Sequence, residues 1–580
     1  MTNMFVHRVR AIVPYLACLH LLLANSTRLD AGNGEITVES KGGVVVCVSP
    51  PAAEVGLAVL KSGGNAVDAA VAVGFAQAVT WPEAGNIGGG GFMLVCPANG
   101  KEPVVVDYRE VAPQKATKEM FAKGIDWQSA KTAGVPGTVR GLELAHKKFG
   151  KKPWKDLVMP AVKLAEDGFT VNAALAKSLN EVLSDPKTTN AEFRKTFSRK
   201  DDAKWQNGDT LRQPNLGRTL RVIAEVGPDA FYHNKDLLLR VDSKTPADLL
   251  EAEMTFSNGL ITSKDLVNYK AIERTPIRGT YRGFEILAPP PPSSGGITLI
   301  ETLNILENFE VKKHPWNSPE TTHLVAEAMR RAFCDRARYL GDPDFTKFTV
   351  NTTTKEYAKK LIKGIDLTKA TRSDTLAPEI ELSKESNDTT HFSIIDKDGM
   401  AVSNTYTLEN AYGCRVVVRG AGYILNNEMT DFNPRPGVTT RTGIIGTEPN
   451  QIAPGKRMLS SMCPTIVLKD NKPILITGSP GGRTIINTVL GVVVNTIDYE
   501  AGGRAAIDAP RLHHQWFPDR IVIEERPDAA KLSAALKMLG HTVAKSAQQG
   551  DAHTIRIDPK TGMRTGIADH RRDGKALGEQ

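Results

Sequence analysis

One apolar segment, residues 66–80, constrains the fold of this chain more than any other stretch. Its sequence, AVDAAVAVGFAQAVT, has helical spacing but carries Ala and Val on nearly every face. A helix without a polar face must be covered by other layers on most sides. The chain has 580 residues, of which 41% are hydrophobic, so it can form a hydrophobic core large enough to cover this helix. We therefore expect several domains or one large α/β unit.

A glycine-rich loop follows this helix. Residues 85–95, GNIGGGGFMLV, open into a strand, whereas the glycine fingerprint of a dinucleotide site opens into a helix. Four consecutive glycines instead suit a place where backbone passes close to other backbone. The next strand, from residue 104, ends in charge at Arg109 and Glu110. An arginine in that position is ordinarily a surface or ion-pair residue.

The chain changes character near Asp388. Residues 135–270 are predicted to be mostly helical, and residues 371–388 are polar without a hydrophobic period, which predicts an exposed loop. Beyond this point strands dominate. We expect a hairpin of residues 392–395 and 401–408, strands at 423–425, 465–468 and 473–477, and a helix at 484–497.

Charge and cysteine content narrow the functional classes. The formal charge of +8 arises from 73 basic and 65 acidic residues, and the basic stretch 194–204 is interrupted by Asp201 and Asp202. This pattern predicts a solvated helix face and no nucleic-acid partner. Six cysteines without a CxxC pair predict buried thiols, neither a zinc site nor a disulfide framework.

The N-terminus has the features of a secretory signal. His7, Arg8 and Arg10 precede an apolar run, residues 11–24, that is too short to span a bilayer comfortably and ends in small residues. We expect residues 1–26 to be removed. The mature protein is then predicted to be periplasmic or secreted, with no membrane span.

The stretch NDTTHFS, residues 387–393, places Thr389 and Thr390 at the mouth of a predicted buried strand. A threonine hydroxyl becomes a nucleophile when a base removes its proton, and the α-amine of an N-terminal threonine, with a pKa of about 7.7 to 8.0, can be that base. Cleavage between Asp388 and Thr389 would create this amine. Alternatives stay open on these residues alone. His391 could be the base, although we prefer a histidine that is packed or hydrogen-bonded on the strand, and the two threonines could reflect only the β-propensity of this residue type.

An ordered set of motifs bears on this choice. After DTTHFS come TYTLENAYG, GYILNNEMTDF, KRMLSSMCPTIV, TGSPGGRTII and APRLHHQW, and before it GGNAVDAAVAVGFAQAVTWPEAGNIGGGGFM, VVDYREVAP and TAGVPGTVRG. Together they resemble the γ-glutamyltranspeptidase family, from about residue 42 to about residue 570. The resemblance implies an N-terminal-nucleophile (Ntn) hydrolase with a four-layer αββα sandwich. It also implies one precursor that cleaves itself into a large subunit, 27–388, and a small subunit, 389–580, which form a heterodimer and a single Ntn-hydrolase unit.

The resemblance assigns roles to individual residues. Thr389 corresponds to the nucleophile and Thr407 to the threonine that assists it. Gly481 and Gly482 match the backbone donors of an oxyanion hole, where two N–H groups point at one developing charge. The positions that hold the γ-glutamyl group are Arg109, Ser460 and Ser461 for the α-carboxylate, and Glu428 and Asp431 for the α-ammonium.

The implied reaction has two steps. Thr389 attacks the γ-amide of glutathione or another γ-glutamyl compound, and the γ-glutamyl ester then passes to water or to an acceptor amino acid or peptide. Neither a metal nor an organic cofactor is expected. The neighbouring His513 and His514 point apart and lack a third ligand, so we interpret them as structural.

Two positions depart from the family pattern. Many members carry asparagine where Glu409 stands, next to the ammonium or the threonines, and many with a lid loop carry tyrosine where Thr442 stands. A smaller lid residue predicts a higher ratio of hydrolysis to transpeptidation.

Three competing functions remain: an acylase for cephalosporin side chains, a hydrolase of poly-γ-glutamate, and a non-catalytic binding protein. Arg109 with the two serines disfavours the first, and the intact threonines and glycines disfavour the last.

Overall fold

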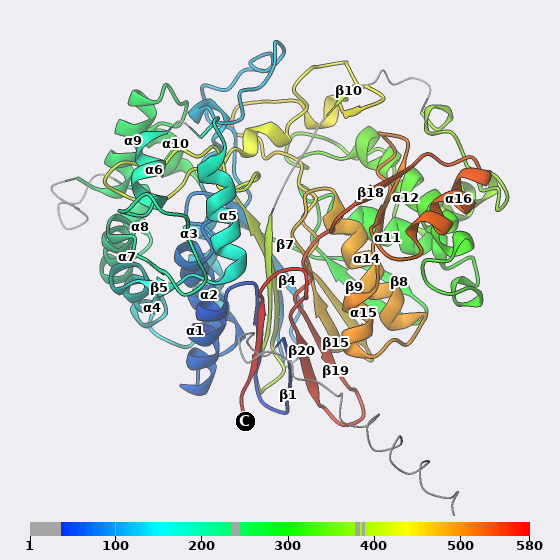
Figure 1. Ribbon diagram of the computed structural model, residues 1–580, viewed down its shortest axis with the longest axis horizontal. Helices are drawn as coiled ribbons and strands as arrows, with labels where there is room; N and C mark the ends of the chain where they lie inside the picture. The colour runs from blue at the N-terminus through cyan, green and yellow to red at the C-terminus, as the bar shows by residue number, and fades with distance from the viewer. Residues whose placement is uncertain (1–35, 99, 189, 234–243, 378–382, 385–388) are drawn as a thin grey trace, which may run out of the picture. The chain divides into compact units, whose positions relative to one another are not determined.

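Two seven-stranded sheets lie face to face between two layers of helices in the computed structural model (Figure 1). The structure describes residues 36–98, 100–188, 190–233, 244–377, 383–384 and 389–580. The first sheet has the order β21 (Lys575–Gly578), β2 (Val44–Cys47), β11 (Thr390–Ile395), β12 (Ala401–Thr407), β3 (Gly90–Cys96), β4 (Val104–Asp107) and β7 (Ile272–Arg274). The second has the order β1 (Thr37–Ser40), β20 (Arg564–Ile567), β19 (Thr554–Ile557), β15 (Lys472–Thr477), β14 (Thr465–Lys469), β9 (Phe284–Ala288) and β8 (Ile277–Tyr281).

Helices cover the outer face of each sheet. Against the first sheet pack α1 (Pro50–Lys61), α2 (Ala66–Thr80) and α3 (Thr138–Phe149), with α4 (Trp154–Asp167), α5 (Ala173–Ser184), α6 (Ala191–Phe197), α7 (Pro214–Val226), α8 (Asp229–Tyr232), α9 (Pro246–Phe256) and α10 (Ser263–Asn268) on the same side (Figure 1). The other side carries α11 (Gly295–Leu306), α12 (Pro319–Tyr339), α13 (Lys355–Leu361), α14 (Thr484–Ile497), α15 (Gly503–Asp508) and α16 (Ala529–Met538). Contacts of β11 with β19 and of β12 with β15 join the sheets. The predicted four-layer αββα sandwich is confirmed.

The apolar helix predicted at residues 66–80 is α2, and every one of its residues is buried. Asn65 and Asp68 form a capping box at its start, which satisfies backbone N–H groups that the helix itself leaves free. The strands beneath it are apolar on both faces. In β2, Val45 belongs to the core on the α2 side, and Val44 to the core between the sheets.

The predicted hairpin around residue 395 lies at the centre of the first sheet. β11 pairs antiparallel with β12, with His391 opposite Thr405, and on its other side with β2, with Phe392 opposite Cys47. Strands from before and after residue 388 are therefore combined within one sheet. The change from helix-rich to strand-rich sequence near residue 388 is not a domain boundary, because Glu35–Gln580 form a single compact unit.

One local expectation was wrong, and another is only partly covered by the described residues. Residues 423–425 form no strand; Ile424 makes a single bridge with Val417, because Gly420 and Gly422, both with a φ of +80°, turn the chain back at once. Of the loop predicted at 371–388, residues 378–382 and 385–388 lie outside the described ranges. The described part contains a short 3₁₀ helix, Ser373–Thr375, and a strand, β10 (Ser383–Lys384), that pairs with β13 (Gly443–Ile444), which directly follows Thr442 of the predicted lid.

Some expectations fall on residues outside the described ranges, namely the signal segment 1–26 and Asp388. The described cysteines are all buried and form no disulfide with one another, as predicted. Over the described residues, no helix is both long and apolar enough to cross a bilayer.

Candidate functional site

Thr389 and Thr407 face each other across two neighbouring strands. Thr389 directly precedes β11 and is only 5% exposed, and Thr407 is the last residue of β12. Their hydroxyl oxygens are 3.5 Å apart, and the Thr407 hydroxyl accepts a hydrogen bond from the Glu409 backbone N–H at 2.8 Å. The two predicted catalytic hydroxyls thus lie together in a buried place.

The glycine-rich loop holds the end of β12. A Cβ atom on Gly89 would lie 2.0 Å from the Thr407 carbonyl oxygen, and one on Gly88 would lie 2.1 Å from the Ile424 carbonyl oxygen. The same Thr407 carbonyl accepts a hydrogen bond from the side chain of Asn86 at 2.8 Å. The prediction of close backbone contact is confirmed. Asn86 was not predicted, although it stands inside the quoted motif.

His391 is a buried structural residue and not a base for Thr389. Its Nδ1 lies 2.8 Å from the Thr405 hydroxyl and its Nε2 lies 3.1 Å from the Ser393 hydroxyl, so both ring nitrogens have other partners. Burial lowers the pKa of this imidazole well below its ordinary value. Of the alternatives left by the sequence, the packed and hydrogen-bonded histidine agrees with the structure.

Gly481 and Gly482 form a turn between β15 and α14. Their φ angles are +128° and +54°, and a Cβ on Gly481 would lie 2.5 Å from the Thr484 hydroxyl, so the turn requires glycine. Gly478, at the start of the turn, packs directly on the ring of His391. The imidazole two residues beyond Thr389 thereby supports the turn that carries the predicted oxyanion donors.

Arg109 forms the centre of a buried charge cluster. Its Nη1 lies 2.5 Å from Glu428 and 3.5 Å from Glu110, its Nη2 donates a hydrogen bond to Asp431, and its Nε donates to the Met458 carbonyl at 3.2 Å. The side chains of Arg109, Glu110 and Glu428 are at most 1% exposed. The structure thus pairs the predicted carboxylate-binding residue with both predicted ammonium-binding residues. Glu110 was not predicted, although it follows Arg109 in the sequence.

Three carboxylates converge beside Arg109. Oxygen atoms of Glu409, Glu428 and Asp431 all lie within 4.8 Å of one another, a spacing that suits a cation such as an ammonium group or a metal ion. Burial raises the pKa of Glu428 and of Glu110, although the charge of Arg109 lowers both. Glu409 holds a φ of +78°, where asparagine is tolerated better than glutamate. The cluster carries more acid than base and can accept a further cation.

Ser460 and Ser461 lie between two arginines. The segment that contains them begins at Met458, whose carbonyl binds Arg109, and the Ser461 hydroxyl accepts a hydrogen bond from Arg336 at 3.1 Å. Ser460 is held by its backbone, since its carbonyl accepts bonds from the N–H and the hydroxyl of Ser294. Arg336 and Ser294 come from distant segments and were not predicted.

Other groups of possible metal ligands have structural partners. His323 and His541 bond to each other at 2.7 Å, and the neighbouring Glu327 is ion-paired with Arg331 at 2.6 Å. The adjacent His513 and His514 contact Gln515 and Asp519 respectively, so they point apart as predicted.

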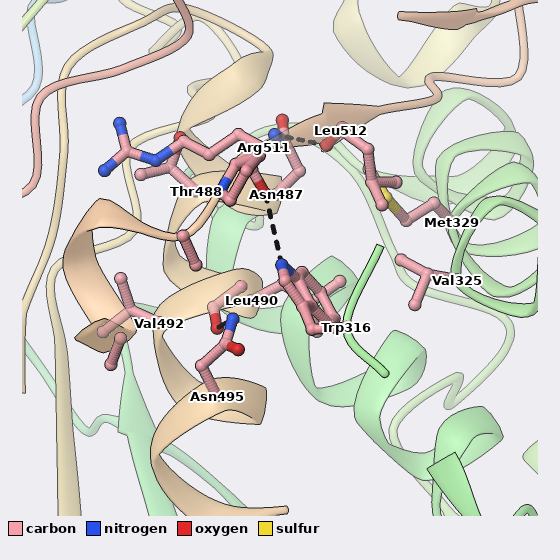
Figure 2. A pocket seen from close by; sticks show the side chains of 14 residues that line it. Trp316, Val325, Met329, Asn487, Thr488, Leu490, Val492, Asn495, Arg511 and Leu512 are labelled. Atoms are coloured by element: carbon pink, nitrogen blue, oxygen red, sulfur yellow. Dashed lines mark hydrogen bonds between the residues drawn. The ribbon is translucent and has the colours of Figure 1, made fainter. Parts of the chain in front are cut away.

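A mostly apolar pocket lies elsewhere, between α12 and α14 (Figure 2). Trp316, Val325, Met329 and Leu490 contribute its apolar walls, and Asn487 donates a hydrogen bond to the Leu512 carbonyl at 2.7 Å. None of the predicted site residues lines it.

Comparison with known proteins agrees with this geometry. A family model described as gamma-glutamyltranspeptidase matches residues 52–579. A glutathione hydrolase proenzyme of Escherichia coli (strain K12) is 47% identical over 532 residues, which are 90% of this chain and 89% of the relative. The crystal structure of a cephalosporin acylase from Bacillus halodurans is similar with a TM-score of 0.81 and 28% identity, over 96% of this chain and 99% of the other. The Helicobacter pylori gamma-glutamyltranspeptidase structure has a TM-score of 0.52 and 41% identity, over 56% of this chain and 91% of the other.

Proposed function

The chain belongs to the γ-glutamyltranspeptidase family, and from this premise we propose that it cleaves itself before Thr389 and then acts as a γ-glutamyltransferase and glutathione hydrolase. Residues 27–388 and 389–580 are the two subunits of the mature heterodimer. The donor is glutathione or another γ-glutamyl compound. The acceptor is water, an amino acid or a peptide.

The chemistry begins at the Thr389 hydroxyl. In the precursor this oxygen attacks the carbonyl of residue 388, and water releases the resulting ester and leaves a free α-amine on Thr389. That amine, with an ordinary pKa of about 7.7 to 8.0, takes the proton of the hydroxyl during turnover. The Thr407 hydroxyl, 3.5 Å away, orients the nucleophile, and the N–H groups of the turn at Gly481 and Gly482 stabilise the oxyanion.

The observation that carries this proposal is the cluster of one buried arginine and converging carboxylates. A γ-glutamyl group presents an α-carboxylate and an α-ammonium on one carbon. The ammonium can replace the guanidinium as the partner of Glu428 and Asp431, with Glu409 as a third carboxylate beside it. The α-carboxylate then takes the freed face of Arg109 with Ser460 and Ser461. The carboxylates of the site would thus exchange a guanidinium for an ammonium, and Arg109 would exchange a protein carboxylate for that of the substrate.

The first test is a denaturing mass spectrum of the wild type beside Thr389→Ala. We expect two fragments that meet at residues 388 and 389 in the wild type and one uncut chain in the variant. Thr390→Val, which keeps the shape of the neighbouring buried side chain, is the matched control and should still be cut. An uncut wild type would leave Thr389 without an α-amine and would favour the binding-protein alternative.

The second test separates this function from that of an acylase, which the similarity to the Bacillus halodurans structure suggests. A γ-glutamyl anilide and its desamino analogue, a glutaryl anilide, differ only in the ammonium group. We expect the wild type to prefer the γ-glutamyl anilide, because the carboxylate cluster serves only that group. A preference for the glutaryl anilide would support the acylase.

Two further points belong to the same proposal. The N-terminal pattern supports a periplasmic or secreted location, which cell fractionation tests. The small Thr442 in the lid supports hydrolysis over transfer, and transpeptidation that dominates at a moderate acceptor concentration would contradict it.

A further inference from the structure

A polar cavity beside the γ-glutamyl residues brings two arginines together. Its lining includes Asp431 and Ser461, and also Arg336 from α12 and Arg483, which directly follows Gly482. Arg336 is only 9% exposed, and Arg483 is partly exposed. The cavity therefore continues from the predicted glutamyl subsite toward the oxyanion turn.

Arg336 has neutral partners. Its Nε donates to the Ser294 hydroxyl at 2.8 Å and its Nη2 to the Ser461 hydroxyl at 3.1 Å, and it makes no ion pair with a carboxylate of the described residues. Arg331, on the same helix, is instead paired with Glu327. An arginine stays protonated in proteins, so a buried one without a carboxylate is costly to keep.

The two guanidinium groups also affect each other. Burial lowers the pKa of Arg336, and Asp431 offsets this only in part. Burial lowers the pKa of Arg483, and the charge of Arg336 lowers it further. Two neighbouring positive charges in a cavity of restricted solvent access favour the entry of an anion.

We propose that Arg336 and Arg483 form a second carboxylate subsite, for the part of the substrate beyond the scissile γ-amide. The assignment rests on the proposed function, which already uses Arg109 and the carboxylates for the two charges of the glutamyl group. A γ-glutamyl peptide has one more carboxylate, at its C-terminus, and an acceptor amino acid or peptide has one as well. Arg483 follows the turn that faces the scissile carbonyl, so its side of the cavity is the side of the leaving group and the acceptor.

The test compares a γ-glutamyl dipeptide that has a free C-terminal carboxylate with the same peptide as its C-terminal amide. We expect kcat/KM of the wild type to be at least about tenfold higher for the acid, as a charged hydrogen bond would give. Arg336→Gln and Arg483→Gln should each reduce this acid-to-amide ratio several-fold, and Arg336→Lys should restore part of it. Arg338→Gln, on the same helix but paired with Asp335 at 3.7 Å, is the matched control and should leave the ratio unchanged.

Folding and function are read separately. The mass spectrum of the cut chain and the thermal midpoint show whether Arg336→Gln folds, and we expect no fall in the midpoint because the variant removes a buried charge that lacks a carboxylate. If Arg336→Gln does not fold, Arg483→Gln and Arg336→Lys carry the same comparison.

Two results would overturn the subsite: a wild-type ratio near one, or an equal loss for acid and amide in the variants, which would mean that Arg336 only positions Ser461. Inactivity of the wild type toward both peptides and toward a γ-glutamyl anilide would instead overturn the proposed function itself.

Discussion

Two buried clusters of arginines and carboxylates differ in their balance of charge. At the candidate site, Arg109 faces Glu110, Glu428 and Asp431, one base against three acids. The second cluster, next to β17 (Ile521–Glu524), joins two bases with two acids: Arg511, Arg571, Glu524 and Asp569. Except for Asp431, whose side chain is 19% exposed, the members of both clusters are buried, so the main difference lies in composition.

The pKa directions follow this difference. Burial raises the pKa of Glu428, and the single arginine offsets it incompletely. Although burial acts in the same sense on Glu524 and Asp569, Arg511 and Arg571 bring the pKa of both carboxyls below their ordinary values. The balanced cluster is complete as it stands and belongs to the fold. We expect the unbalanced cluster to bind a cation, because buried carboxyls whose pKa is raised for want of a second positive partner are typical of functional sites.

The largest expected effect is on stability, in the balanced cluster. Arg571→Met leaves Glu524 without the guanidinium that bonds it at 2.6 and 2.8 Å, and removing one partner of a buried ion pair costs about 3 to 5 kcal/mol. Urea denaturation measures this loss. Lys147→Met removes a lysine that is 70% exposed from its pair with Glu143, which keeps Arg140 as a partner at 2.8 Å, so it should change the free energy of unfolding by less than about 1 kcal/mol. Similar losses in both variants would remove the distinction between the two clusters.

The next effect is on activity, in the unbalanced cluster. Arg109→Gln should lower kcat/KM for a γ-glutamyl anilide by roughly a hundredfold, because a buried charge that pairs with the substrate is lost. Its unfolding free energy should fall less than that of Arg571→Met, since Glu110 and Glu428 can take up protons in the absence of the arginine. A variant that loses stability but keeps activity would assign Arg109 to the fold.

Glu428→Gln should have a smaller and more selective effect. It removes one of three carboxylates around the ammonium, so kcat/KM should fall roughly tenfold for a γ-glutamyl anilide, as for the loss of one charged hydrogen bond. The slower reaction with the glutaryl anilide, which has no ammonium, should change little. An equal fall with both substrates would argue against an ammonium site.

The smallest effect concerns pH. In the folded protein Glu428 holds its proton more tightly than in the unfolded chain, so above about pH 4.3 the folded state binds more protons and the free energy of unfolding falls as pH rises. Glu428→Gln lacks this group, and its stability relative to the wild type should therefore increase between pH 5 and pH 8. Parallel urea titrations at the two pH values measure the difference. A relative stability that decreases toward pH 8 would mean that the pKa of Glu428 is lowered and not raised.

The sequence was most informative where local pattern determines structure. The helix predicted at 484–497 is α14, and the close backbone contacts of the glycine run are present. The strand predicted at 423–425 failed because the glycines on either side of Ala421 turn the chain back sharply, which leaves Ile424 a single bridge with Val417 and no regular ladder.

The charge relations of the site could not be read from the sequence. The resemblance to a known family identified Arg109 and Glu428 as candidates, but nothing local in the sequence indicates that they pair with each other across 319 positions of the chain. Arg336 is harder still, because helix α12 carries several arginines and only the packed structure shows which of them meets Ser461. Long-range ion pairs depend on the whole fold. A single sequence contains both residues of such a pair but does not show that they contact each other.

The central position of β11 has a consequence for how the processed protein would fold. β11 begins next to the proposed cut and is bonded on one side to β2 and on the other to β12, so its neighbours come from both products. A precursor refolds as a single chain, at a rate independent of concentration. Once cut, the same core can re-form only when two separate chains meet, and in dilute solution outside a cell that encounter is slow. Maturation would thus turn a reversible folding reaction into an assembly step, and the lifetime of the enzyme would depend on how slowly it opens.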